Sequence, residues 1–260
     1  MSTATQTTVT VDTKELEEKV QRMYRAVANE PHGEYHFELG RSLAERLGYP
    51  ADALDELPEG AIESFAGVGY FFDLARLQHG ERVVDLGSGS GMDVFFACTQ
   101  VGPRGHVVGI DFTSEQRAKA QALAADFPQA EFRAGRIERL PVEDTSTDCV
   151  ISNGVINLSP DKGAVFAEAA RVLRPGGRLA IADIVTEHQF KDSIVCDADL
   201  WASCIAGAAQ QDTYRGAIEA AGLTIEAIKT NPYEFISQRA RNASAKYGVK
   251  SVSLLARKER

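Results

Sequence analysis

Short apolar runs alternate with amphipathic stretches over the central part of the chain. Runs of five or six residues rich in Val, Ile and Ala are typical of strands buried on both faces, whereas apolar residues at three- and four-residue intervals predict helices. The pattern predicts strands at 82–86, 106–111, 130–134, 147–152 and 178–183, with helices at 93–100, 114–126 and 162–173 and a turn at 175–177. Strands that alternate with helices favour a parallel sheet joined by crossovers.

The two ends of the chain carry weaker patterns. Amphipathic helices are predicted at 14–28 and 37–47, and a helical stretch at 198–221 is followed by strands at 224–229 and 251–256 around a helix at 236–246. Two late strands fit an antiparallel edge. We therefore expect an α/β fold with a doubly wound, Rossmann-like, seven-stranded sheet. The expected parts are a disordered tail at 1–13, a helical cap or lid at 14–80, and a cofactor-binding domain at 81–260 with helical insertions near its end.

Composition narrows the partners. The chain has 260 residues, of which 44% are hydrophobic, and this is enough for one sizeable core. A formal net charge of -9 disfavours nucleic acids and anionic membrane surfaces. No apolar run approaches the roughly 20 residues of a membrane span, the Ser/Thr-rich start does not resemble a secretory signal, and the cysteines are too sparse for a disulfide scaffold. We expect a cytoplasmic protein with a small-molecule substrate and neither a nucleic-acid nor a membrane partner.

A glycine loop directly follows the first strand of the alternating region. Glycines permit a tight turn and close approach of a ligand, and the helix that follows adds free N–H groups. The dinucleotide pattern G-x-G-x-x-G would require a glycine at Met92, but the third glycine is Gly91. The resulting D-x-G-x-G-x-G run from Asp85 resembles motif I of class I methyltransferases, whose cofactor is S-adenosylmethionine. An ordinary turn is the alternative.

Further cofactor contacts are expected at the carboxyl ends of the neighbouring strands, because ligands of open α/β sheets bind there. Asp111 ends the second strand about 20 residues past the loop, where an acid binds both ribose hydroxyls; the alternative is that it caps the next helix. The resemblance places residues 135–138 beside the adenine and residues 152–159 beside the departing methyl group. The expected cofactor residues are Asp85, Gly87, Ser88, Gly89, Gly91, Met92, Asp93, Asp111, Phe112, Thr113, Gly135, Arg136, Ile137, Glu138, Asn153, Gly154 and Val155.

Longer stretches resemble one branch of this family, the arsenite methyltransferases. The similarity covers about residues 48–225, with matching runs at 63–70, 84–93, 108–113, 151–162, 179–185 and 200–208. That branch binds trivalent arsenic through cysteine thiolates, which are soft ligands for a soft ion. The resemblance places the thiolates at Val68, Gly154 and Cys204, so that one thiol remains, and one thiolate cannot chelate arsenic. The missing side chain at Gly154 is expected to leave room for a bulkier acceptor.

The other cysteines offer few replacements. Cys196 lies eight positions before Cys204, which places the two about 80° apart on one continuous helix; a rearranged pair remains an alternative. Cys98 and Cys149 fall in a helix and a strand, and both are interpreted as small buried hydrophobic residues. A buried structural thiol is the alternative interpretation of Cys204 itself.

Methyl transfer from a sulfonium mainly requires alignment of the nucleophile, the methyl group and the leaving sulfur. A hydroxyl, amine or carbon acceptor can also need a base. The candidates for catalysis or for lining the acceptor site are Tyr70, Asn153, Asn157, Trp201 and Cys204. His32 and His36 have the spacing of a helical metal pair, but Gly33 disfavours a helix there. Contact with the substrate and a solvated position before a helix are the other interpretations, and we expect no metal.

The resemblance thus implies an S-adenosylmethionine-dependent methyltransferase that is similar to the arsenite enzymes and acts on a small molecule. The acceptor is arsenic(III) or, alternatively, a thiol, amine, hydroxyl or carbon nucleophile. A cofactor-binding homologue without catalytic activity and an NAD-dependent oxidoreductase are the remaining hypotheses.

Overall fold

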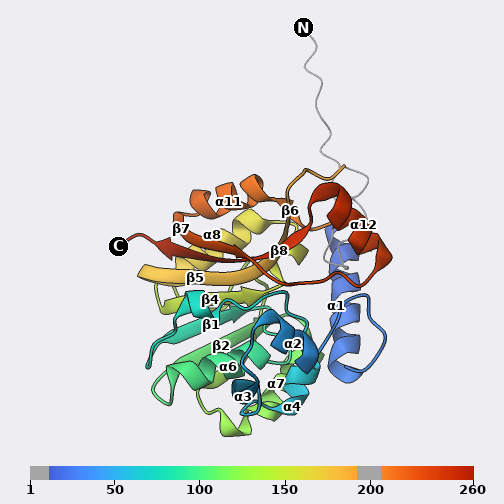
Figure 1. Ribbon diagram of the computed structural model, residues 1–260. Coiled ribbons are helices and arrows are strands. Elements are labelled where there is room, and N and C mark those ends of the chain that lie inside the picture. The colour runs from blue at the N-terminus through green and yellow to red at the C-terminus, as the bar shows by residue number, and fades with distance from the viewer. Residues whose placement is uncertain (1–11, 192–205) are drawn as a thin grey trace.

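The computed structural model describes residues 12–191 and 206–260, and its centre is a mixed sheet (Figure 1). The strands are β1 (Arg82–Leu86), β2 (His106–Asp111), β3 (Ala130–Ala134), β4 (Thr147–Asn153), β5 (Leu173–Thr186), β6 (Ala209–Gln210), β7 (Leu223–Thr230) and β8 (Lys250–Lys258). Their order is β3-β2-β1-β4-β5-β8-β7, and the short β6 pairs with β5. Strands β1 to β5 are parallel, whereas β8 is antiparallel to β5 and β7. The predicted doubly wound fold with an antiparallel edge is confirmed, with β6 as an addition.

Helices cover both faces of this sheet (Figure 1). They are α1 (Thr13–Asn29), α2 (Arg41–Leu47), α3 (Ala51–Leu54), α4 (Glu59–Glu63), α5 (Phe72–Ala75), α6 (Met92–Val101), α7 (Ser114–Leu123), α8 (Lys162–Val172), α11 (Gln211–Ala220) and α12 (Gln238–Tyr247), with 3-10 turns η1 (Ala124–Asp126) and η2 (Ile156–Leu158). None of the helices in the described ranges is long and apolar enough to cross a membrane.

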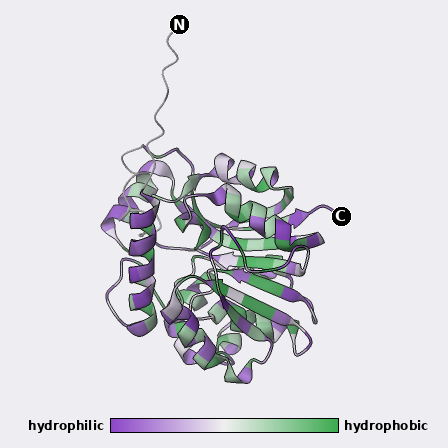
Figure 2. Ribbon diagram, turned by 180° about the vertical axis from the view of Figure 1, so that it is seen from behind, coloured by the Kyte–Doolittle hydropathy of each residue, from purple (hydrophilic) through white to green (hydrophobic). Residues whose placement is uncertain are grey.

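Two apolar clusters form the core, one on each face of the sheet. Neighbouring residues of a strand point to opposite faces, so Val83 joins one cluster and Val84 joins the other. Figure 2 shows the apolar central strands between helices whose outer surfaces are polar. Burial on both faces explains why these strands appear in the sequence as continuous apolar runs.

Some predicted boundaries differ from the structure. The prediction of a helix from residue 37 is wrong, because α2 begins at Arg41 after Gly40, whose φ of 85° is not helical. Of the helical stretch predicted at 198–221, residues 198–205 lie outside the described ranges, and in the described part β6 precedes α11. The turn predicted at 175–177 is an irregularity within β5, where pairing with β4 jumps from Leu173 to Arg178.

Helix α1 lies beyond the ends of the parallel strands and beside α7 (Figure 1). It begins at Thr13, where Asp12 accepts hydrogen bonds from the backbone N–H groups of Lys14 and Glu15. Leu16, Val20 and Val27 form its buried face. Residues 1–11 lie outside the described ranges, whereas Asp12 and Thr13 of the predicted tail belong to the start of α1. The division of the chain into tail, cap and domain stays a prediction.

Candidate functional site

A cavity of about 510 Å³ lies at the carboxyl ends of β1, β2 and β4, with α1 forming part of its wall. All residues predicted to contact the cofactor line it except Gly91 and Gly154. Parallel strands bring loops that are distant in the sequence to one edge of the sheet, which is why these residues meet. Helix α1 adds Leu16, Val20 and Tyr24, and the segment after α4 adds Phe65 and Gly67.

The glycine loop needs its glycines for two different reasons. Gly87, Gly89 and Gly91 all have positive φ angles, of 72°, 53° and 94°. A Cβ atom on Gly91 would lie 2.8 Å from the ring of Phe132, so this glycine also permits close packing of α6. Gly91 therefore shapes the loop without lining the cavity.

The carboxylate of Asp85 is buried in the cavity wall, where the described residues offer it no hydrogen-bond donor. Its side chain is 2% exposed. Within the described residues no hydrogen bond or ion pair reaches it. Burial raises its pKa well above the ordinary value, and the nearby charges of Asp93 and Asp111 add to this. A buried carboxylate without a donor is unfavourable, so the position suits a ligand that brings a cation or hydrogen-bond donors.

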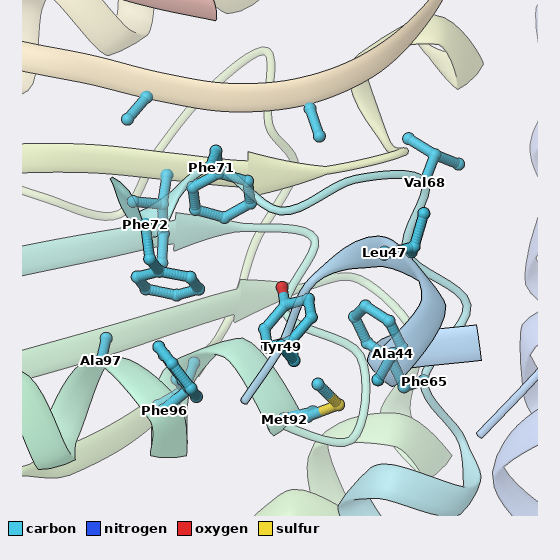
Figure 3. Packing of buried hydrophobic residues seen from close by; sticks show 14 of the residues in the cluster. Ala44, Leu47, Tyr49, Phe65, Val68, Phe71, Phe72, Met92, Phe96 and Ala97 are labelled. Atoms are coloured by element: carbon cyan, nitrogen blue, oxygen red, sulfur yellow. The ribbon is translucent and has the colours of Figure 1, made fainter. Parts of the chain in front are cut away.

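Asp93 lines the same cavity but has partners. The hydroxyl of Tyr49 donates to its Oδ1 at 2.5 Å, and the amide of Asn153 donates to its Oδ2 at 3.0 Å. Burial raises the pKa of Asp93 to about 6, and these two hydrogen bonds limit the rise. Figure 3 shows the ring of Tyr49 among apolar side chains that include Met92 and Phe65. Tyr49 could not be predicted from the sequence, because 44 residues separate it from Asp93 and its local context indicates only the end of a helix.

The side-chain amide of Asn153 forms hydrogen bonds with the backbone of the loop before β1. Its Oδ1 accepts hydrogen bonds from the backbone N–H groups of Val68 at 2.8 Å and Gly69 at 3.2 Å, and its Nδ2 donates to the carbonyl oxygen of Gly69 at 3.0 Å. From the opposite side, Ser251 donates to the carbonyl oxygen of Val68 at 2.6 Å. Asn153 thus holds this loop against the cavity, in a positioning role.

Asp111 combines its two predicted placements. It lines the cavity, while its Oδ2 accepts from the N–H of Gly89 at 2.9 Å and its Oδ1 accepts from the N–H of Thr113 at 2.7 Å. Thr113 is the N-cap residue of α7. The carboxylate therefore ties the glycine loop to the start of a helix and still faces the ligand space.

Two of the three positions matched to arsenic-binding thiolates, Val68 and Gly154, are packed with hydrocarbon. Val68 is 1% exposed, and a Cβ atom on Gly154 would lie 3.1 Å from its Cγ1. Neither residue lines the cavity. The expectation that Gly154 leaves room for a bulkier acceptor is wrong, because Val68 fills that space. Cys196, Trp201 and Cys204 lie outside the described residues.

The other candidate side chains lie away from the cavity surface. Tyr70 packs against the ring of Tyr49 with centroids 4.9 Å apart, and Asn157 is fully buried below the cavity wall. Burial raises the pKa of Cys98 and Cys149 to about 12, and both are fully buried, as predicted.

The two histidines are not brought together as a metal site. The Nε2 of His32 lies 3.7 Å from a carboxylate oxygen of Glu63, and the ring of His36 packs edge-on against Phe37. Among the described residues, no group of three or more His, Cys, Asp or Glu side chains is arranged to hold a metal ion.

Gln116, a second residue that no sequence pattern indicated, connects the glycine loop to α1. Its Oε1 accepts from the hydroxyl of Ser90 at 2.5 Å, and its Nε2 donates to the carbonyl oxygen of Tyr24 at 2.8 Å. Ion pairs of Arg25 with Glu115 and of Arg136 with Glu17 hold the same helix. The wall formed by α1 is thus fastened by polar contacts to the sheet domain.

Relatives of known activity are similar to this chain in sequence. An arsenite methyltransferase of Halobacterium salinarum is 45% identical over 202 residues, which are 75% of this chain and 51% of that protein. The human arsenite methyltransferase is 40% identical over 170 residues, covering 60% of this chain and 44% of that protein. The chain thus spans about half the length of the curated relatives it matches.

Solved structures agree with this fold. An arsenic(III) S-adenosylmethionine methyltransferase from Chlamydomonas reinhardtii has a TM-score of 0.63 at 28% identity and covers 86% of this chain and 75% of its own. A geranyl diphosphate C-methyltransferase from Streptomyces coelicolor, solved with S-adenosyl-L-homocysteine, has a TM-score of 0.67 at 17% identity and covers 95% of this chain and 99% of its own.

The family model described as a methyltransferase domain matches residues 77–222. This span runs from just before β1 to the end of α11 and therefore contains the glycine loop, Asp111 and the loop after β4. Because the match covers more than half of the chain and the sheet has the same arrangement as in solved methyltransferases, this protein belongs to the methyltransferase domain family.

Proposed function

We propose that the protein transfers a methyl group from S-adenosylmethionine to a small-molecule acceptor in the cytoplasm. The observation that carries the proposal is the buried Asp85 carboxylate in the cavity, which has no donor among the described residues. The methionine end of the cofactor carries an ammonium group, and the cofactor also carries a sulfonium. These cations suit a cavity wall in which Asp93 and Asp111 lie near Asp85.

Each part of the cavity then has a task. Asp85 and Asp93 hold the ammonium end, Asp111 accepts hydrogen bonds from the ribose hydroxyls, and residues 135–138 flank the adenine. When bound, S-adenosylmethionine supplies a methyl group on a sulfonium, which is already activated for displacement. The protein therefore needs chiefly to align the acceptor and to exclude water, and α1 with Leu16 and Val20 supports both.

The charge of the cavity bears on the acceptor. The carboxylates that line it are Glu17, Asp85, Asp93, Asp111 and Glu138. Among the described lining residues Arg136 is the only cation, and it is paired with Glu17. An anionic acceptor would be repelled, so we propose an uncharged or cationic acceptor with an apolar part.

Arsenic(III) is the second candidate acceptor, and the identity to arsenite methyltransferases favours it. The residues Val68 and Gly154 favour a different nucleophile, because neither of these two matched positions offers a thiolate. Val68 also packs over Gly154, so no acceptor space opens there. Turnover of arsenite with excess thiol, measured beside neutral, amine and carboxylate acceptors, separates these candidates.

Calorimetry with S-adenosylhomocysteine tests the cofactor directly. We expect micromolar affinity or better and no binding of NADH. Binding of NADH alone would refute the proposal. Binding of S-adenosylhomocysteine without turnover of any acceptor in the panel would instead favour a homologue without catalytic activity.

A further inference from the structure

The loop after β4 forms one wall of the cavity and is held from behind by a single ammonium group. Val155, Leu158 and Ser159 of this loop line the cavity, whereas Lys162 lies behind them. We infer that Lys162 is a positioning residue, which fixes this wall for the cofactor and the acceptor by binding the backbone of the loop. The inference rests on the proposed function, because it concerns the same cavity.

Two hydrogen bonds join Lys162 to the loop backbone. Its Nζ donates to the carbonyl oxygen of Ser159 at 2.9 Å and to that of Asn157 at 3.3 Å. Asn157 belongs to the 3-10 turn η2, and Ser159 directly follows it. The backbone of this short segment uses only some of its own carbonyl groups as hydrogen-bond acceptors. One ammonium group therefore sets the position of two consecutive parts of the wall.

Local stability does not explain a lysine at this place. Lys162 is the first residue of α8, where the positive end of the helix dipole disfavours a cation. Burial lowers its pKa to about 8, and the charges of Asp183 and Glu138 only partly oppose this effect. A residue that is unfavourable for its own helix is better explained by what it does for the neighbouring loop.

Acidic groups hold the loop from two other sides. The carboxylate of Asp183 on β5 accepts from the N–H of Asn157 and from the hydroxyl of Tyr214 on α11, the latter at 2.6 Å. Glu138, which lines the cavity, accepts from the hydroxyl of Ser159. The wall is thus fixed by one cation that binds carbonyl oxygens and two anions that bind N–H and O–H groups.

A matched pair of variants separates positioning from general stability. Lys258 on β8 also donates two hydrogen bonds to backbone carbonyl oxygens, those of Ala170 at 2.7 Å and Leu173 at 2.8 Å, but it does not line or support the cavity. We expect Lys162→Met to weaken S-adenosylhomocysteine binding about tenfold. Lys258→Met should stay within about twofold of the parent, although it loses the same kind of contact.

Titration gives a readout that a purely structural role would not change. Above pH 8 the hydrogen bonds of Lys162 lose their charge, so affinity in the parent should fall more between pH 7 and pH 9.5 than in Lys162→Met. The amino group of the ligand titrates alike in all the proteins, so this difference isolates Lys162. Asp183 and Glu138 are the charged groups that face Lys162, and Asp183, whose pKa is raised to about 6, stays ionised over this range.

Each outcome is decisive. Equal affinities and equal pH dependence in the parent and Lys162→Met would overturn the inference, as would equal losses in Lys162→Met and Lys258→Met. If Lys162→Met does not fold, Lys162→Gln, which keeps a donor without the charge, takes its place in the same comparison. A parent protein that does not bind S-adenosylhomocysteine would refute the proposed function instead.

Discussion

At the scale of single residues, the cavity contains carboxyl groups that lower the stability of the folded protein when no ligand is bound. Asp85 is buried and has no donor among the described residues, and Asp93 carries a second carboxylate nearby. Such charges cost stability unless a counter-charge arrives. The proposed cofactor would bring that charge, so stability and binding should respond in opposite directions when Asp85 is neutralised.

Asp85→Asn tests this opposition. We expect the free energy of unfolding of the ligand-free protein to rise by about 1–3 kcal/mol, because an uncompensated buried charge is removed. The affinity for S-adenosylhomocysteine should fall at least about tenfold. Urea denaturation and calorimetry measure the two effects.

Asp148→Asn is the matched control. Asp148 is also buried, but it accepts from the N–H of Arg82 at 2.7 Å and pairs with Arg174. Its replacement should lower stability and leave the affinity unchanged. If Asp85→Asn also lowered stability and left the affinity unchanged, the proposal that Asp85 binds the ligand would be wrong.

At the scale of elements, the sequence predicted where strands and helices occur better than where they end. The apolar runs at β1, β2 and β4 are continuous because both faces of each strand are buried, so their bounds were close to those observed. The start of α2 was missed because its limit is set by the backbone of Gly40 and not by a change in hydrophobicity. The partners of α1 were also beyond prediction, since its contacts with α7 span more than 80 residues.

The fastening of α1 through Gln116 can be tested at this scale. Gln116→Ala removes its links to Ser90 and Tyr24, so trypsin should cleave α1 faster, at sites such as Lys19 and Arg22. Binding of S-adenosylhomocysteine should weaken a few-fold and should slow cleavage. Time courses of proteolysis with and without the ligand measure this.

Gln121 lies on α7, like Gln116, and Gln121→Ala serves as the control. Its side-chain amide contacts the carbonyl oxygen of Phe132 and not α1. Cleavage rates in this variant should match those of the parent. Equal rates in all three proteins would show that Gln116 does not hold α1.

At the scale of the whole molecule, buried carboxylates should make stability depend on pH. Burial raises the pKa of both Asp93 and Asp183 to about 6, from an ordinary value of 3.8. The folded state then binds these protons more tightly than the unfolded state, so their contribution to stability is complete below about pH 4 and is lost as the pH rises through 6. Glu131 and Glu168, whose pKa values are lowered, act in the opposite direction only below about pH 4.5.

We therefore expect the ligand-free protein to have a lower free energy of unfolding at pH 7 than at pH 5, by about 1–3 kcal/mol. Saturating S-adenosylhomocysteine should reduce the difference, since its ammonium favours ionised carboxylates. Asp183→Asn should remove part of the dependence. A stability that is flat or rises over this interval in urea denaturation would contradict the assigned burial costs.

The sequence by itself determined the alternating sheet, the glycine loop and the acid at Asp111, because each depends on residues close together in the chain. Tertiary structure alone decided the contacts of Tyr49 with Asp93, of Lys162 with the loop after β4, and of Val68 with Gly154. Parallel strands place distant loops at one edge, and the chemistry of that edge depends on which side chains meet there. The positions matched to arsenic-binding thiolates show this most clearly. Gly154 has no side chain, but it leaves no space for an acceptor because Val68 packs over it.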